Sequence, residues 1–120
     1  MSASSPIIPD GYFELSTLDK TLACFLEVDL GTETSKVWTS KIEVYVRYAA
    51  SEEFEQRFHL SRFRVLVVTS SQRRVEMLRR LALHYTDRIF WFATVTSVKD
   101  AGFWSAVWLR PDGTEMRSFL

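Results

Sequence analysis

The sequence has one cysteine and no excess of charge of either sign. Because Cys24 stands alone, the chain of 120 residues cannot form an intramolecular disulfide. A single thiol is typical of proteins from a reducing compartment, so we expect a cytoplasmic location. The 15 basic and 15 acidic side chains cancel. This balance excludes a strongly basic coat protein for nucleic acids and a polyanionic tail, but it leaves room for a local basic face.

Long hydrophobic runs and glycine-rich loops are missing as well. No apolar stretch approaches the roughly 20 residues of a membrane span, and the first ten residues lack the features of a signal peptide. We therefore expect no membrane partner. None of the four glycines belongs to a phosphate-binding loop, so nucleotide triphosphate hydrolysis has no support. The only histidines, His59 and His84, are far apart in the sequence, which argues against a zinc site or a Ser-His-Asp triad.

What the sequence does have is enough apolar side chains for one core. Hydrophobic residues make up 47% and aromatic residues 14% of the chain, which excludes disordered and fibrous proteins. The length predicts a single domain. Residues 1–9 carry serine and proline without a periodic pattern, so we expect a flexible segment there and an α/β domain over residues 10–120.

The first half of this domain predicts a hairpin and a long helix. Two β-rich segments at 12–16 and 21–30 are joined by a polar link of four residues, a spacing typical of an antiparallel hairpin. A helix is expected over 33–58, with its apolar positions on one broad arc. Lys41 projects into the middle of that arc. A lysine there needs a carboxylate to compensate the cost of removing its charge from water, so we expect Lys41 to point to the end of the sheet that carries Glu27 and Asp29.

The second half predicts two parallel strands. The apolar runs 63–69 and 89–95 are typical of strands covered on both faces. A helix from Ser70 or Ser71 to about Tyr85 separates them, which indicates a right-handed crossover. A turn would join the last two segments into a terminal hairpin, 106–110 and 115–119. The predicted fold is α/β, a mixed sheet with flanking helices.

Three carboxylates are expected to cluster around the first hairpin. Glu27 and Asp29 are two residues apart on one strand and so share a face, and the hairpin brings Asp10 back towards them. Converging carboxylate oxygens are the ligands that Mg²⁺ or Mn²⁺ prefers. An ion held there could orient a water for attack on phosphorus.

Simpler interpretations of these residues stay open. Asp10, between a proline and a glycine, is equally consistent with a turn. Glu27 and Asp29 could be exposed charges at a strand end. Lys41 could extend its stem over the apolar arc to reach water, or pair with a carboxylate in a purely structural role.

These segments in this order resemble a known family. Pro9-Asp10 followed by Glu27-Val28-Asp29 looks like the PD-(D/E)XK nuclease superfamily. More closely, the sequence resembles the replication-relaxation family of plasmid and mobile-element proteins. The segments that carry this resemblance are FLEVDLGTE, the helix with Lys41 and Tyr45, FRVLVVTSSQRRVEMLRRLA, RIFWFATV and VWLRPDG.

The resemblance implies a restriction-endonuclease-like fold and a set of site residues. Asp10 and Glu27 would be metal ligands together with the Val28 carbonyl, and Mg²⁺ or Mn²⁺ would be the cofactor. Asp29 stands where the superfamily usually has lysine. Lys41 could supply the missing ammonium from the helix, and Asp29 would then assist.

The resemblance also implies partners. The family has a winged-helix DNA-binding part, and the superfamily core begins with a helix and a strand before the Pro-Asp pair. Only nine residues precede Asp10 in this sequence, so we expect a core without its N-terminal elements. A sheet left partly uncovered would favour a homodimer, and a winged-helix protein would be a second partner.

Arg73, Arg79 and Arg80 form a basic face on the helix that follows the third strand segment. Such a face is usually solvated, and contact with DNA phosphates is the alternative.

Two functions are therefore consistent with the sequence. The first is a Mg²⁺-dependent DNA nuclease, with Asp10, Glu27, Asp29 and Lys41 in its catalytic site. The second is a nuclease-fold domain without catalysis that serves as a replication accessory or oligomerisation module.

Overall fold

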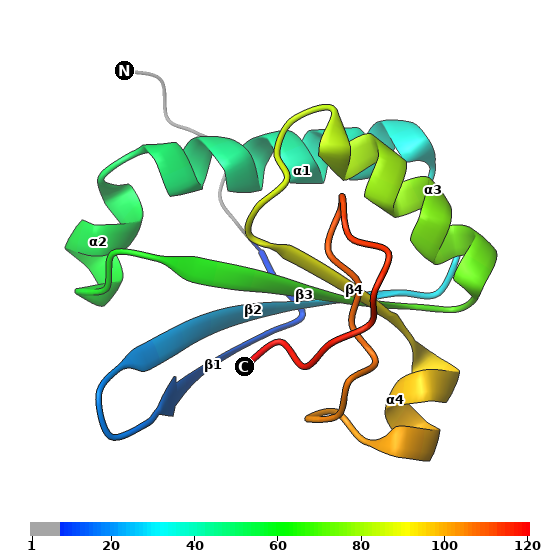
Figure 1. The fold of residues 1–120 in the computed structure, drawn as a ribbon. Helices are drawn as coiled ribbons and strands as arrows, with labels where there is room; N and C mark the ends of the chain where they lie inside the picture. Colours follow the sequence, from blue (N-terminus) through cyan, green and yellow to red (C-terminus); the bar gives the residue numbers. More distant parts are fainter. Residues whose placement is uncertain (1–7) are drawn as a thin grey trace.

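A four-stranded mixed sheet forms the centre of the protein (Figure 1). The computed structural model describes residues 8–120, so the flexible segment predicted over 1–9 lies almost wholly outside the described residues. The elements follow one another as β1 (Gly11–Ser16), β2 (Thr21–Asp29), α1 (Ser35–Ala50), α2 (Glu53–Phe58), β3 (Phe63–Thr69), α3 (Gln72–Leu83), β4 (Phe90–Thr94) and α4 (Val95–Ala101).

The strand order confirms the two predicted pairings. The sheet has the order β1-β2-β3-β4, with β1 antiparallel to β2 and the other two pairs parallel. The parallel strands β2, β3 and β4 therefore end at one edge, from which α1, α3 and α4 begin (Figure 1). We call this the carboxyl edge, and the edge where β3 and β4 begin the amino edge. The α/β class with a mixed sheet and helices is confirmed.

Each face of the sheet has its own core, because neighbouring strand residues point to opposite faces. One face packs against α1, α2 and α3, and includes Phe25, Val65 and Phe92. The other face packs against α4 and the C-terminal segment, and includes Leu66 and Trp108. Figure 1 shows α1 and α3 on one side of the sheet and α4 on the other. Both faces of β3 and β4 are thus covered, as their unbroken apolar sequences predict.

The long helix predicted over 33–58 is wrong, because the structure has two helices there. α1 ends at Ala50, and Ser51 takes an extended conformation with φ −92° and ψ 171°. The Ser51 hydroxyl donates to the Tyr48 carbonyl, a local hydrogen bond that competes with continuation of the helix. α2 then turns back over the core and buries Phe54.

Two further expectations about the second half need correction. The strand predicted over 89–95 ends at Thr94, whose side chain caps α4 by accepting from the Ser97 N–H. The terminal hairpin is reduced to one isolated bridge between Trp108 and Arg117, while Leu109 bridges to Phe92 in β4. The C-terminal segment is therefore held by the sheet more than by itself.

Candidate functional site

The charged residues singled out in the sequence gather at the carboxyl edge. Glu27 and Asp29 are the last two residues of β2 that face α1 and α3, and both are buried. Because α1 and α3 begin at this edge, Trp38, Lys41 and Tyr45 of α1 and Arg74 of α3 lie over the two carboxylates. The exposed fractions of Glu27 and Asp29 are 3% and 1%, so each carboxylate needs protein partners.

Asp29 is enclosed by donors from three elements. The Arg74 guanidinium donates to it twice, at 2.7 Å and 3.1 Å, and the Trp38 indole N–H donates at 3.2 Å. The Thr69 hydroxyl donates as well. Burial tends to raise the pKa of Asp29, but these hydrogen bonds together hold it below its ordinary value. Asp29 is therefore a fully bonded anion in the interior.

Glu27 is paired with α1. Its Oε2 accepts from the Tyr45 hydroxyl at 2.6 Å, and its Oε1 accepts from Lys41 Nζ at 3.2 Å. Lys41 Nζ also lies 2.8 Å from Glu33 Oε1. Burial raises the pKa of Glu27, although the bonds from Tyr45 and Lys41 oppose that shift. The expectation that Lys41 points to the carboxylates of this edge is confirmed, and its structural pairing with Glu27 is what the structure has.

Asp10 lies beside Glu27 at the surface. Its main-chain N–H donates to the Leu26 carbonyl at 2.9 Å, and its Oδ2 accepts from the Val28 N–H at 2.7 Å. Asp10 therefore lies just before β1 and is held to the end of β2 by one main-chain and one side-chain hydrogen bond. The negative charge of Asp10 contributes to the raised pKa of Glu27, after burial as the main cause.

The expected convergence of three carboxylates on one ion is not found. Within residues 8–120, no group of three or more His, Cys, Asp or Glu side chains could hold a metal ion. The physical reason is that Arg74 of α3 forms an ion pair with Asp29, so this carboxylate is turned to α3 and not to a shared ion. Asp10 and Glu27 remain as the neighbouring pair.

Sequence reasoning missed Arg74, although it is central to this edge. Ser71 caps α3 by accepting from the Arg74 N–H, which fixes Arg74 in the first turn, next to the end of β3. Its guanidinium also donates to the Glu33 carbonyl, so it joins α3 to the segment before α1. The signal in the sequence was the serine cap followed by a cation three residues later.

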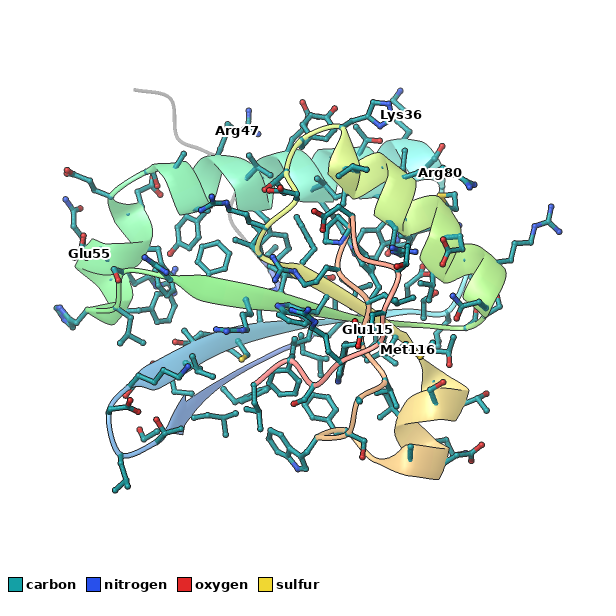
Figure 2. All side chains as sticks on the ribbon, viewed as in Figure 1. Lys36, Arg47, Glu55, Arg80, Glu115 and Met116 are labelled. Atoms are coloured by element: carbon teal, nitrogen blue, oxygen red, sulfur yellow. The ribbon has the colours of Figure 1, made fainter. Side chains whose placement is uncertain are left out.

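The basic face predicted on α3 is divided in two. Arg73 and Arg80 are exposed, and Figure 2 shows Arg80 on the outer side of α3. Arg79 is turned inward, with 12% of its side chain exposed and an ion pair to Glu76 at 2.8 Å. It also donates to the carbonyls of Arg110 and Gly113. Arg79 therefore anchors the C-terminal segment instead of facing solvent.

Comparisons with known proteins give one positive finding. A family model described as replication-relaxation matches residues 2–62, which reach from the start of the chain to the segment before β3. No curated protein and no solved structure matches the chain. In the part of the chain that the structure describes, no helix is long and apolar enough to cross a membrane.

Proposed function

Because the chain belongs to the replication-relaxation family, we propose that it serves the replication or mobility of plasmid DNA as a nuclease-like domain without catalysis. The strand order supports the nuclease-like part of this proposal. A hairpin followed by two parallel strands and a crossover helix is consistent with the PD-(D/E)XK core that the sequence resembles. DNA is then the partner, and the homodimer and the winged-helix protein stay predictions.

The observation that carries the proposal is the complete internal pairing of the buried carboxylates. Asp29, at the position of the usual lysine, accepts hydrogen bonds from Arg74, Thr69 and Trp38. Both oxygens of Glu27 accept from side chains of α1. A metal ion that recruited either carboxylate would have to compete with the buried donors that already hold it. The edge is therefore built to hold α1 and α3 on the sheet.

Thermal melting with and without divalent metal tests this function. We expect the melting temperature to be the same in Mg²⁺, in Mn²⁺ and in EDTA, because ligands stabilise only the proteins that bind them. Supercoiled plasmid incubated with the protein and either metal should stay intact. A metal-specific rise in melting temperature, together with nicking, would contradict the proposal.

A second function, the Mg²⁺-dependent nuclease, is favoured by one observation. Asp10 is close enough for its charge to act on Glu27, and Lys41 Nζ lies 3.2 Å from Glu27. In this alternative Asp10, Glu27 and the Val28 carbonyl would hold the ion, and Lys41 would present its ammonium beside them. The bound metal would supply charge neutralisation at the phosphate and a more acidic water.

The Asp10→Asn variant separates the two functions. Asp10 is exposed, so the variant should fold, and only the nuclease predicts that a metal-specific stabilisation or nicking disappears in it. Asp19→Asn is the matched control, because Asp19 is an exposed carboxylate in the turn between β1 and β2. If neither the parent nor the variants cut DNA under any divalent metal, the accessory function stands.

A further inference from the structure

An open cleft lies at the amino edge, remote from the paired carboxylates. It has a volume of about 520 Å³ and is formed where β3 and β4 begin, together with the last turn of α1. Four arginines line it, Arg62, Arg64, Arg88 and Arg110, and none of its described lining residues is acidic. The cleft therefore concentrates positive charge in a protein whose net charge is zero.

Trp91 fixes two of these arginines in place. The guanidinium carbon of Arg110 lies 4.5 Å from the centre of the Trp91 ring, and that of Arg64 lies 6.0 Å from it. Trp91 itself is only 5% exposed. The ring thus orients the guanidinium groups through cation–π contacts and offers no free face on which a base could stack.

The two arginines held by Trp91 lack anionic partners. The Nε atoms of Arg64 and Arg110 are buried and form no hydrogen bond within residues 8–120. Neither residue belongs to an ion pair of the described chain, and Arg110 donates from Nη2 to the Asp87 main-chain carbonyl at 3.1 Å. Buried donors without acceptors are costly unless a ligand supplies the acceptor.

Nearby cations add to the positive charge that lacks an anionic partner. Burial lowers the pKa of Arg110, and the cations Arg117 and Arg64 lower it further, while Asp112 and Asp87 oppose the shift. Asp87 forms an ion pair with Arg88, but that pair is long, at 3.8 Å, and both side chains are exposed. The acidic neighbours therefore do not neutralise the four arginines.

We propose that this cleft binds the phosphodiester backbone of DNA, with the guanidinium groups of Arg62, Arg64, Arg88 and Arg110 donating to phosphate oxygens. The planar guanidinium matches a phosphate with two parallel donors, which makes arginine the usual residue for such contacts. Since the Trp91 ring is covered, recognition is through phosphates and is independent of base sequence. This inference rests on the proposed function only for the choice of DNA as the polyanion.

Salt-dependent binding of a labelled 20-base-pair duplex to the whole chain tests the proposal. Arg62→Ala combined with Arg88→Ala changes only exposed side chains, so folding should be kept. We expect affinity to fall at least about tenfold, and the slope of log K against log salt to become shallower by about one for each phosphate that is no longer bound. Arg64→Ala should give the same direction of change, with folding checked by circular dichroism.

The matched control is Arg73→Ala combined with Arg80→Ala, which removes two exposed arginines from α3. These changes should leave affinity and slope within about twofold of the parent. The proposal is overturned if the α3 variant loses binding while the cleft variants keep it, or if the parent binds no duplex at low salt. Metal-dependent nicking by a protein whose cleft still governs affinity would instead overturn the accessory function and leave the cleft assignment in place.

Discussion

The buried charges at the two edges of the sheet differ in whether they are paired. At the carboxyl edge, Glu27 and Asp29 are buried and each is bonded to a cation from a neighbouring helix. At the amino edge, Arg64 and Arg110 are held against Trp91, and their buried Nε donors have no acceptor among residues 8–120. A paired buried charge fixes elements to one another, whereas an unpaired one is available to a partner.

This difference decides where function should be sought. The residues that most resemble a catalytic set are the ones whose bonding capacity the fold already uses. The arginines of the amino edge carry no motif, yet the buried Nε donors of Arg64 and Arg110 have no acceptor among residues 8–120. Mutations at the two edges should therefore separate stability from DNA binding.

The largest effect is expected for Arg74→Met. This change leaves the Asp29 carboxylate, which is 1% exposed, without its cation, and it should lower the free energy of unfolding by about 3–5 kcal/mol. Urea denaturation measures the loss. Arg73→Met is the control, since Arg73 is exposed on the same turn and should change stability by no more than about 0.5 kcal/mol. Equal effects of the two substitutions would contradict a structural role for the carboxyl edge.

A smaller loss is expected for Lys41→Met, about 2 kcal/mol near pH 7, because Tyr45 still donates to Glu27. The pKa of Glu27 is raised in the folded protein, so this carboxyl group takes up its proton at a higher pH than it does in the unfolded chain. Below that pH the missing ion pair no longer matters, and the difference between variant and parent should shrink. Denaturation curves at pH 7 and pH 4 test this; a difference that grows in acid would refute it.

Because of Asp29, the free energy of unfolding of the parent protein should fall steeply in acid. Its pKa is lowered in the folded state, so its stabilisation is present above the ordinary value of about 3.9 and is lost as the pH falls towards the folded value. Stability should drop over that window by up to about 1.4 kcal/mol per pH unit from this group. Asp29→Asn removes the titrating group, and its stability should vary less with pH over the same window.

The smallest effect on stability is expected at the amino edge. Arg62→Ala should change the free energy of unfolding by no more than about 0.5 kcal/mol, because Arg62 is exposed. Arg64→Met removes a charge that opposes Arg110 and should be neutral or slightly stabilising. Losses of several kcal/mol from either change would mean that the cleft, like the carboxyl edge, is structural.

Local patterns in the sequence were enough to predict much of the fold. The run 63–69 is apolar except for Arg64 and Thr69, and it forms a strand buried on both faces. The hairpin follows from two β-rich segments with a short polar link, and Lys41 was placed correctly by helical periodicity. In each case the information lies within a few residues of the element concerned.

The features that the sequence did not predict depend on distant residues. Asp29 meets Arg74 across 45 positions, so no local pattern distinguishes a metal ligand from a bonded anion. Arg79 turns inward because its acceptors are main-chain carbonyls 31 and 34 residues later. The cleft joins the starts of two strands to Arg110 and could be recognised only after folding.

Amide chemical shifts during titration of the ¹⁵N-labelled protein with duplex DNA test the contrast between the two edges most directly. We expect the shifts to concentrate at the amino edge, on residues 61–64, 88–91 and 110, with little change at 27–33 and 69–74 and no effect of added Mg²⁺. Shifts concentrated at the carboxyl edge, and present only when Mg²⁺ is added, would contradict this contrast and return the metal-dependent nuclease to first place.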